Sequence, residues 1–269
     1  MSKTYEVEVG MDENLTEAAN RYYKLSKKMR KKIDGVNIAL KMTAEKIKNA
    51  DKIKVEKTEI INKRDKFWFE KYRFSFTRNN MLILAGKDAT SNEIVVKKHM
   101  EKTDLHFHTN IQGSAHVILK DGQNASKEDY EDTALISAIY SKALPAGLGS
   151  VDVYFVKPEQ VTKAAQTGEF LSTGSFVIRG ERNWFKKVRL EFSIGMYKYE
   201  NQDICIVANK PIFEITKSPY FRTLVPGRKT KSEVCNQLLS DIKKLGYKQV
   251  TINDLLSILP AGKFDFKKN

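Results

Sequence analysis

The chain is poor in the features that mark secreted, membrane-bound and disulfide-stabilised proteins. It has 269 residues but only two cysteines, Cys205 and Cys235, and no apolar run of the roughly 20 residues that a transmembrane helix needs. Two cysteines are too few for a disulfide framework and favour a reducing compartment. The N-terminal residues are polar and charged, so we expect no signal peptide. These absences predict a cytoplasmic protein without a membrane partner.

The familiar short motifs of catalysis are also missing from the sequence. There is no GxSxG nucleophile elbow, no GxxxxGK[ST] phosphate loop and no GxGxxG after a predicted strand. Cys205 lies in an apolar segment and is expected to be a small buried hydrophobe rather than a nucleophile. We therefore expect no enzymatic activity and no cofactor.

Acidic residues are scarce relative to basic ones. The chain has 47 lysines and arginines against 33 aspartates and glutamates, which gives a formal net charge of +14. A surplus of this size indicates a polyanionic partner, with nucleic acid ahead of an anionic membrane surface.

Residues 1–66 are predicted to form a basic coiled-coil arm. Apolar residues recur at steps of three and four, which is typical of a coiled-coil seam, and a hairpin tip is expected at Asn49–Asp51 with a returning helix over 52–66. The outer face is an unbroken block of cations, which is either a solvated face or a surface neutralised by a phosphate backbone. The expected seam is Leu15, Ala18, Tyr22, Leu25, Met29, Ile33, Val36, Leu40, Thr43 and Ile47.

From Phe67 the apolar pattern changes from helical to alternating, which predicts strands. The sequence predicts an α+β fold in which a mixed or antiparallel sheet with flanking helices occupies residues 67–200. Residues 201–269 are expected to form a closing α/β extension. The expected strands are 68–76, 81–85, 104–109, 115–120, 151–156, 175–179, 188–196 and 204–208, and the expected helices are 92–98, 128–144, 232–245 and one around Leu255.

Three of the four histidines fall within eleven residues. His106 and His108 are two apart on a predicted strand and so share one face. Together with His116 or His99 they have the number of nitrogen ligands that a zinc site needs. Packing inside the sheet and contact with RNA are the other two interpretations, and all three remain open here.

Basic residues alternate with aromatic ones between Arg179 and Lys187. Trp184 is suited to stack on a base while neighbouring cations hold phosphates. The alternative is a hairpin turn with Trp184 folded into the core. The residues expected to contact nucleic acid are Lys27, Lys28, Arg30, Lys31, Lys32, Lys97, Lys98, His106, His108, His116, Arg179, Arg182, Trp184, Lys186 and Lys187.

Several long segments resemble the NFACT-R domain of the NFACT family, which includes eukaryotic NEMF, bacterial RqcH and archaeal relatives. The matching segments are WFEKYRF from Trp68, GKDATSNEIVVKKHM from Gly86, DLHFHTNIQGSAHVI from Asp104 and GEFLSTGSFVIRGERNWF from Gly168. The segment from Glu13 to Lys32 resembles the start of the family's middle coiled coil.

The resemblance implies an RNA-binding module of a ribosome-associated quality control factor. Its implied partners are the rRNA of the large ribosomal subunit, tRNA and a chain that contains the NFACT-N domain. The Asp-Arg pair that the family needs for C-terminal tailing lies in NFACT-N, so no such residue is carried onto this chain. A histidine-metal enzyme and a protein-interaction scaffold built on the coiled coil are the competing classes.

Overall fold

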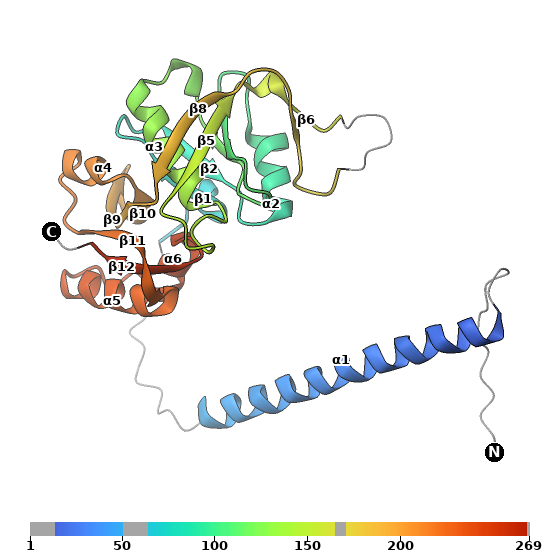
Figure 1. Ribbon diagram of the computed structural model, residues 1–269. Helices are drawn as coiled ribbons and strands as arrows, with labels where there is room; N and C mark the ends of the chain where they lie inside the picture. Colours follow the sequence, from blue (N-terminus) through green and yellow to red (C-terminus); the bar gives the residue numbers. More distant parts are fainter. Residues whose placement is uncertain (1–13, 51–63, 165–170, 268–269) are drawn as a thin grey trace. The chain divides into compact units, whose positions relative to one another are not determined.

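The computed structural model describes residues 14–50, 64–164 and 171–267. The chain divides into two compact units, Met1–Ile60 and Ile61–Asn269, which are described separately below (Figure 1).

The described part of the first unit is one long helix, α1 (Leu15–Ala50). Its start is fixed by a reciprocal cap, in which the Asn14 side chain accepts from the Glu17 N–H at 2.9 Å and the Glu17 carboxylate accepts from the Asn14 N–H at 3.1 Å. The helix continues through Asn49 and Ala50, so the hairpin tip expected there is wrong for these two residues. Most of the expected returning arm lies outside the described residues.

The second unit is built on a six-stranded antiparallel sheet with the strand order β1-β2-β4-β3-β5-β8. The strands β1 to β4 are buried at almost every position, because elements cover both faces of the sheet there, whereas the edge strand β8 is largely exposed. The strands are β1 (Arg73–Phe76), β2 (Leu82–Ala85), β3 (Leu105–Thr109), β4 (Val117–Leu119), β5 (Ser150–Val156) and β8 (Asn183–Arg189).

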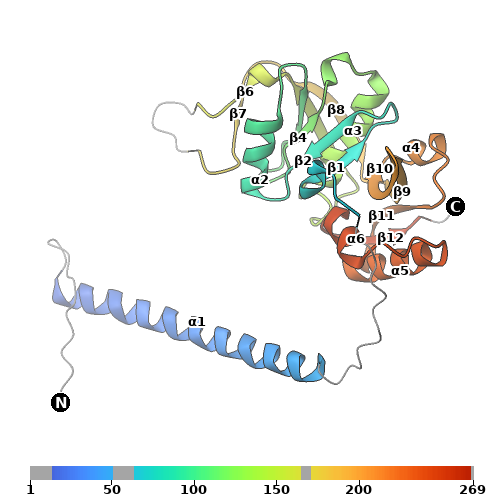
Figure 2. The same cartoon turned by 180° about the vertical axis from the view of Figure 1, so that it is seen from behind.

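Helix α3 (Lys127–Ile139) packs on one face of this sheet, and α2 (Ala89–Ile94) lies on the opposite side (Figure 2). The helix was expected to extend to residue 144, but α3 ends at Ile139. Its last turn is interrupted because the Ser141 hydroxyl donates to the Ala138 carbonyl and accepts from the Ala143 N–H. The remaining short elements are η1 (Trp68–Lys71), the π-helix η2 (Val95–His99), η3 (Gly122–Asn124), η4 (Pro158–Gln160), β6 (Val161–Thr162) and β7 (Val177–Ile178).

A four-stranded antiparallel sheet with the order β10-β9-β11-β12 completes the unit. The expected boundary at residue 200 falls in the turn between β9 and β10, which pair with each other. The two sheets share a core, and the Ser75 hydroxyl of β1 donates to the Val207 carbonyl of β10 at 2.7 Å. The elements are β9 (Phe192–Tyr199), β10 (Gln202–Ala208), α4 (Lys210–Ile215), β11 (Phe221–Thr230), α5 (Lys231–Lys244), α6 (Ile252–Ile258) and β12 (Lys263–Phe266).

The α+β class and the antiparallel arrangement are confirmed, whereas three expected strands are corrected. The strand expected from Trp68 starts at Arg73, because residues 68–71 form a 3-10 turn that buries Phe69. The strand expected over 175–179 is only two residues long. The strand expected over 188–196 is divided between β8 and β9, which belong to different sheets.

Candidate nucleic-acid interface

Four rings form a row across the strands of the six-stranded sheet. His108 of β3 is paired in register with Tyr154 of β5, and Tyr154 is paired with Trp184 of β8. His116, which directly precedes β4, stacks on His108 with ring centroids 4.5 Å apart. The next distances along the row are 6.1 Å from His108 to Tyr154 and 5.1 Å from Tyr154 to Trp184. We call His116, His108, Tyr154 and Trp184 the ring row.

The ring row lies on the sheet face opposite α3. Neighbouring residues of the same strands point the other way, because side chains alternate along a strand. Phe107 and Phe155 thus pack against Tyr130 of α3, with centroids 6.4 and 5.1 Å from its ring. The alternation that builds the core also brings the polar rings together on the second face.

Cations lie directly over the outer half of the ring row. The guanidinium of Arg182 is 4.8 Å from the centroid of Tyr154, and the Lys186 ammonium is 4.2 Å from that of Trp184. Tyr154 is buried, whereas His108 and Trp184 are partly exposed, so the accessible rings are those of His108 and Trp184.

Strand pairing holds Lys186 and Lys187 in place through Asp152 of β5. The Asp152 carboxylate binds the Lys186 ammonium at 3.0 Å and accepts from the Lys187 N–H at 2.8 Å. Lys187 has a φ of 50° at the point where the register of β5 and β8 shifts. Trp184 therefore lies half-buried in the edge strand β8, and the alternative of a hairpin turn with its ring folded into the core is wrong.

His106, His108 and His116 lie next to one another, as one of the three interpretations required, but His106 is fully buried. The His106 Nε2 and His116 Nδ1 atoms share a hydrogen bond of 2.8 Å. The expectation that His106 contacts RNA is therefore corrected, because this side chain does not reach the surface. His108 and His116 line the pocket described below.

Burial keeps the buried histidines neutral. Desolvation, reinforced by His116 and His108, holds the pKa of His106 well below its ordinary value. Desolvation also lowers the pKa of His116 to about 3 and lowers that of His108. At neutral pH these side chains are flat, uncharged rings with hydrogen-bonding edges, and they do not act as phosphate-binding cations.

The metal interpretation finds no matching geometry among the residues that the structure describes, which contain no group of three or more ligands suited to an ion. The hydrogen bond between His106 and His116 occupies the two nitrogens that face each other, so they are not free to share an ion. His99, the other expected ligand, instead meets Tyr72, whose hydroxyl is 2.9 Å from its Nε2.

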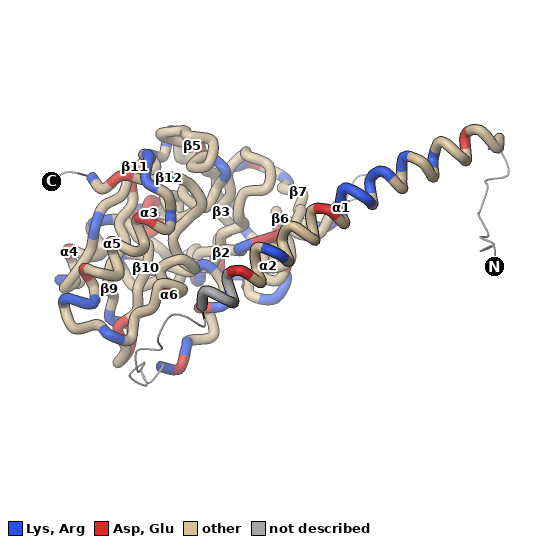
Figure 3. The backbone as a smooth tube through the Cα atoms, turned by 90° about the horizontal axis from the view of Figure 1, so that it is seen from below, with Lys and Arg blue, Asp and Glu red and all other residues tan. Residues whose placement is uncertain are grey.

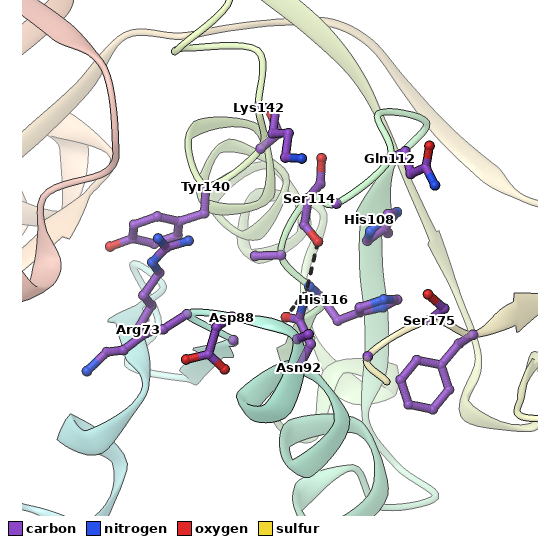
Figure 4. Close-up of a pocket in the computed structure, with 18 of the residues that line it drawn as sticks. Arg73, Asp88, Asn92, His108, Gln112, Ser114, His116, Tyr140, Lys142 and Ser175 are labelled. Atoms are coloured by element: carbon purple, nitrogen blue, oxygen red, sulfur yellow. Dashed lines mark hydrogen bonds between the residues drawn. The ribbon is translucent and has the colours of Figure 1, made fainter. Parts of the chain in front are cut away.

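A pocket of about 1060 Å³ opens beside the inner end of the ring row (Figure 4). Three cations line it: Arg73, Lys87 and Lys142. The Arg73 guanidinium lies 4.7 Å from the centre of the Tyr140 ring. In the part of the chain that the structure describes, none of the three forms an ion pair with a carboxylate. Asp88, the acid among the lining residues, instead caps α2 by accepting from the Ser91 N–H at 2.8 Å.

Close backbone approach shapes this pocket. A Cβ on Gly86 would lie 2.0 Å from Asn92 Oδ1, so only glycine lets the loop pack on α2. The same Asn92 oxygen accepts from the His116 N–H at 3.0 Å. Gly86 thereby positions His116, and sequence patterns gave no sign of this contact.

The other expected contact residues are distributed more widely. Lys97 and Lys98 are exposed on η2, and Lys97 binds Glu93 at 2.6 Å. Arg179 is exposed after β7. Lys27, Lys28, Arg30, Lys31 and Lys32 are exposed on α1, where Figure 3 shows basic residues recurring along the helix.

Sequence reasoning missed Arg73, Lys87 and Lys142, and it also missed Trp68. The Trp68 ring is 51% exposed and stacks on His99 at 5.0 Å. The signal that was available for Lys87 is the GKD segment between the β2 strand and the α2 helix.

These features define an α+β module whose sheet presents rings between cations, as nucleic-acid-binding proteins do. Residues 66–180 match the family model described as the NFACT protein RNA binding domain. The chain is 36% identical over 201 residues to the archaeal Rqc2 homolog aRqcH of Methanocaldococcus jannaschii, a match that covers 74% of this chain and 29% of the relative. The chain belongs to the NFACT family.

Two animal relatives extend this similarity. The ribosome quality control complex subunit NEMF homolog of Drosophila melanogaster is 34% identical, and the match covers 69% of this chain and 19% of the fly protein. Human ribosome quality control complex subunit NEMF is 31% identical, and the match covers 62% of this chain and 16% of the human protein. The chain thus spans less than a third of these relatives' lengths. Among solved structures, it matches the C-terminal part of a fibronectin/fibrinogen-binding protein from Streptococcus suis at 21% identity and a TM-score of 0.38, covering 67% of this chain and 78% of that one.

The matched family model describes an RNA-binding domain, and the NEMF relatives are named as ribosome quality control proteins. No helix among the described residues is long and apolar enough to cross a membrane.

Proposed function

We propose that this chain binds the rRNA of the large ribosomal subunit and also binds tRNA during the rescue of stalled translation. The observation that carries the proposal is the ring row with Arg182 and Lys186 above it, in a chain of the NFACT family. In this proposal the chain binds and positions RNA, and it makes or breaks no covalent bond.

The outer end of the ring row provides the recognition chemistry. The Lys186 ammonium lies over one face of Trp184, and it exchanges its exposed ion pair with Asp152 for a phosphate when a base stacks on that ring. Arg182 reaches a second phosphate from its position over Tyr154. Stacking of a base on an aromatic ring contributes about 1–3 kcal/mol.

The cations of α1 provide a second, less selective contact. Lys27, Lys28, Arg30, Lys31 and Lys32 are all exposed, and the sequence holds no acid between Glu17 and Asp34. Neutralising phosphates with such side chains releases counterions, which makes binding salt-dependent.

Co-sedimentation of the chain with separated ribosomal subunits tests the proposal. Large subunits with and without P-site tRNA, and small subunits, are compared at low and physiological salt. We expect retention on large subunits, strengthened by tRNA and weakened by salt. The double variant Arg182→Gln, Trp184→Leu is expected to lose most of the retention, whereas Lys244→Gln, an exposed cation on α5, serves as the charge control. Equal retention on both subunits, or a flat salt response, would contradict the proposal.

A second candidate function is suggested by apolar side chains on α1. Leu25, Met29 and Ile33 are 43, 47 and 58% exposed, and they fall on the expected seam. Such a seam fits a partner helix. A pull-down that survives RNase treatment and is lost on Met29→Lys, Ile33→Lys would favour this scaffold role over RNA binding.

A further inference from the structure

The cation-lined pocket is not used by the stacking and phosphate contacts proposed above. It lies at the inner end of the ring row, while the proposed contacts involve Trp184 at the outer end. Its lining comes from distant parts of the chain: the starts of β1 and α2, the β3–β4 loop, the end of α3 and the segment before β7.

The two sides of the pocket differ in chemistry. In Figure 4, Arg73 and Asp88 lie on one side, and His108, His116 and Ser175 lie on the other. The side with the histidines also includes Phe176, whose ring is 5.1 Å from that of His116 in an edge-to-face contact. The pocket thus combines a cationic side with a side of neutral rings.

Among the described residues, no carboxylate forms an ion pair with the cations of this side. Arg73 is half-buried, and its guanidinium stacks on Tyr140 without an ion pair. Desolvation lowers the pKa of Arg73, and desolvation together with Arg73 lowers that of Lys87. Both shifts are those of cations that an incoming anion would stabilise. The negative charge of Asp88 opposes these shifts without cancelling them, and its carboxylate is hydrogen-bonded to Ser91 rather than paired with either cation.

The ring side suits a flat ligand with polar edges. His108 and Phe176 are partly exposed toward the pocket, and His116 is fixed behind them by its bonds to His106 and Asn92. A neutral imidazole stacks on a base without attracting phosphate to the same place. The pocket volume of about 1060 Å³ is at the upper end of the range for small-molecule sites.

We propose that this pocket takes one unpaired RNA nucleotide, with its phosphate beside Arg73 and Lys87 and its base against His108 and Phe176. The proposal rests on the RNA-binding function proposed above and deepens it. A base within a helix is stacked and paired and cannot turn out into a pocket, so the ligand is a chain end, a bulge or a single-stranded segment.

Two RNA hairpins with the same stem test this inference, one blunt and one with three unpaired 3′ nucleotides. We expect the wild-type chain to bind the second at least about fivefold more tightly, the lower end of what one stacked base contributes. The variant Ser175→Trp fills the pocket without changing its charge. It is expected to lose the preference and to bind the blunt hairpin as the wild type does. Lys87→Gln is expected to reduce the preference, whereas Lys244→Gln is the matched control.

A measurement on the wild-type chain complements the variants. 5-Bromouridine placed at the unpaired positions is irradiated, and cross-linked residues are mapped by mass spectrometry. Cross-links at His108 or Phe176 support the inference, and cross-links confined to α1 or to Trp184 overturn it. Equal binding of both hairpins, or a preference that Ser175→Trp retains while folded, also overturns it. If neither hairpin binds, the proposed RNA-binding function fails as well, so the two failures are distinguishable.

Discussion

Helix α1 and the sheet face of the second unit both carry cations, but they present them differently. Along α1 the cations from Lys27 to Lys32 are exposed and follow one another in a single block. On the sheet face, Arg182 and Lys186 lie over rings, and Arg73 stacks on Tyr140.

This difference separates attraction from recognition. Exposed cations on long side chains attract any phosphate backbone and are individually interchangeable. Cations that strand pairing places beside rings constrain where a phosphate and a base lie relative to each other. We therefore expect α1 to contribute salt-dependent affinity and the sheet face to contribute selectivity, and the following predictions test this division.

The largest expected effect is on folding, where the two units differ most. Phe107 is fully buried in β3, and Phe107→Ala is expected to lower the free energy of unfolding by about 3–5 kcal/mol. Leu40 on α1 is 61% exposed, and Leu40→Ala is expected to change it by less than about 0.5 kcal/mol. Urea unfolding followed by tryptophan fluorescence reports on the second unit. A comparable loss in Leu40→Ala would show that α1 is part of the same cooperative core.

The next effect is a loss of stability in mild acid. The unfolded chain binds protons at its histidines near pH 6.5, whereas the folded chain keeps His116 neutral down to about pH 3. Stability from this histidine is therefore present above pH 6.5 and is lost as the pH falls toward 3, at about 1.4 kcal/mol per pH unit. His106, whose pKa is also lowered, changes stability in the same direction.

Urea unfolding at pH 7.5, 6.0 and 5.0 measures this loss. The interval lies above the ordinary pKa values of carboxylates, so it isolates the histidines. Residues 15–50 contain no histidine, and α1 is expected to keep its helical circular dichroism over the same interval. A flat stability profile in the second unit would mean that its buried histidines titrate normally.

A smaller effect is expected on RNA affinity when the outer ring is removed. Trp184→Leu keeps an apolar side chain but removes the stacking surface, and it is expected to weaken binding by about 1–3 kcal/mol with an unchanged salt slope. Tyr23→Leu removes a ring that is 70% exposed on α1 and is expected to leave affinity unchanged. Fluorescence anisotropy with a labelled RNA at several salt concentrations separates affinity from slope. Equal losses in the two variants would remove the distinction between the regions.

The smallest effect is expected from a single charge on α1. Lys31→Gln is expected to reduce the slope of log affinity against log salt by less than about 1 and to weaken binding about equally for all RNA sequences. The same anisotropy titrations measure this change. If Lys31→Gln costs as much affinity as Trp184→Leu, recognition resides in α1 rather than on the sheet face.

Local patterns in the sequence predicted much of the fold. The apolar period predicted α1, and the strands expected over 104–109 and 151–156 match β3 and β5 to within a residue or two. The predictions failed where a local pattern ran across a tertiary boundary. Residues 188–196 have continuous strand propensity, but the chain leaves one sheet after Arg189 and enters the other at Phe192.

The candidate site was predictable only in part. His108, His116, Arg182 and Trp184 stood out by residue type, and the structure places the three rings in the ring row and Arg182 over Tyr154. His106 stood out equally, yet it is buried. His106 and His108 share one face of the sheet, which is covered at His106 but partly exposed at His108. Tyr154 and Arg73 carried no signal, since a tyrosine or arginine in a strand is common.

By itself, the sequence determined the basic charge, the long helix, the strand segments and the clustering of histidines, because these depend on composition and on contacts between near neighbours. Only the tertiary structure decided that rings from β3, β5, β8 and the start of β4 form one row, and that Arg73, Lys87 and Lys142 surround one pocket. Strand register and the close packing of Gly86 on Asn92 join residues far apart in the chain. Such contacts depend on how whole elements pair and pack, which no local pattern records.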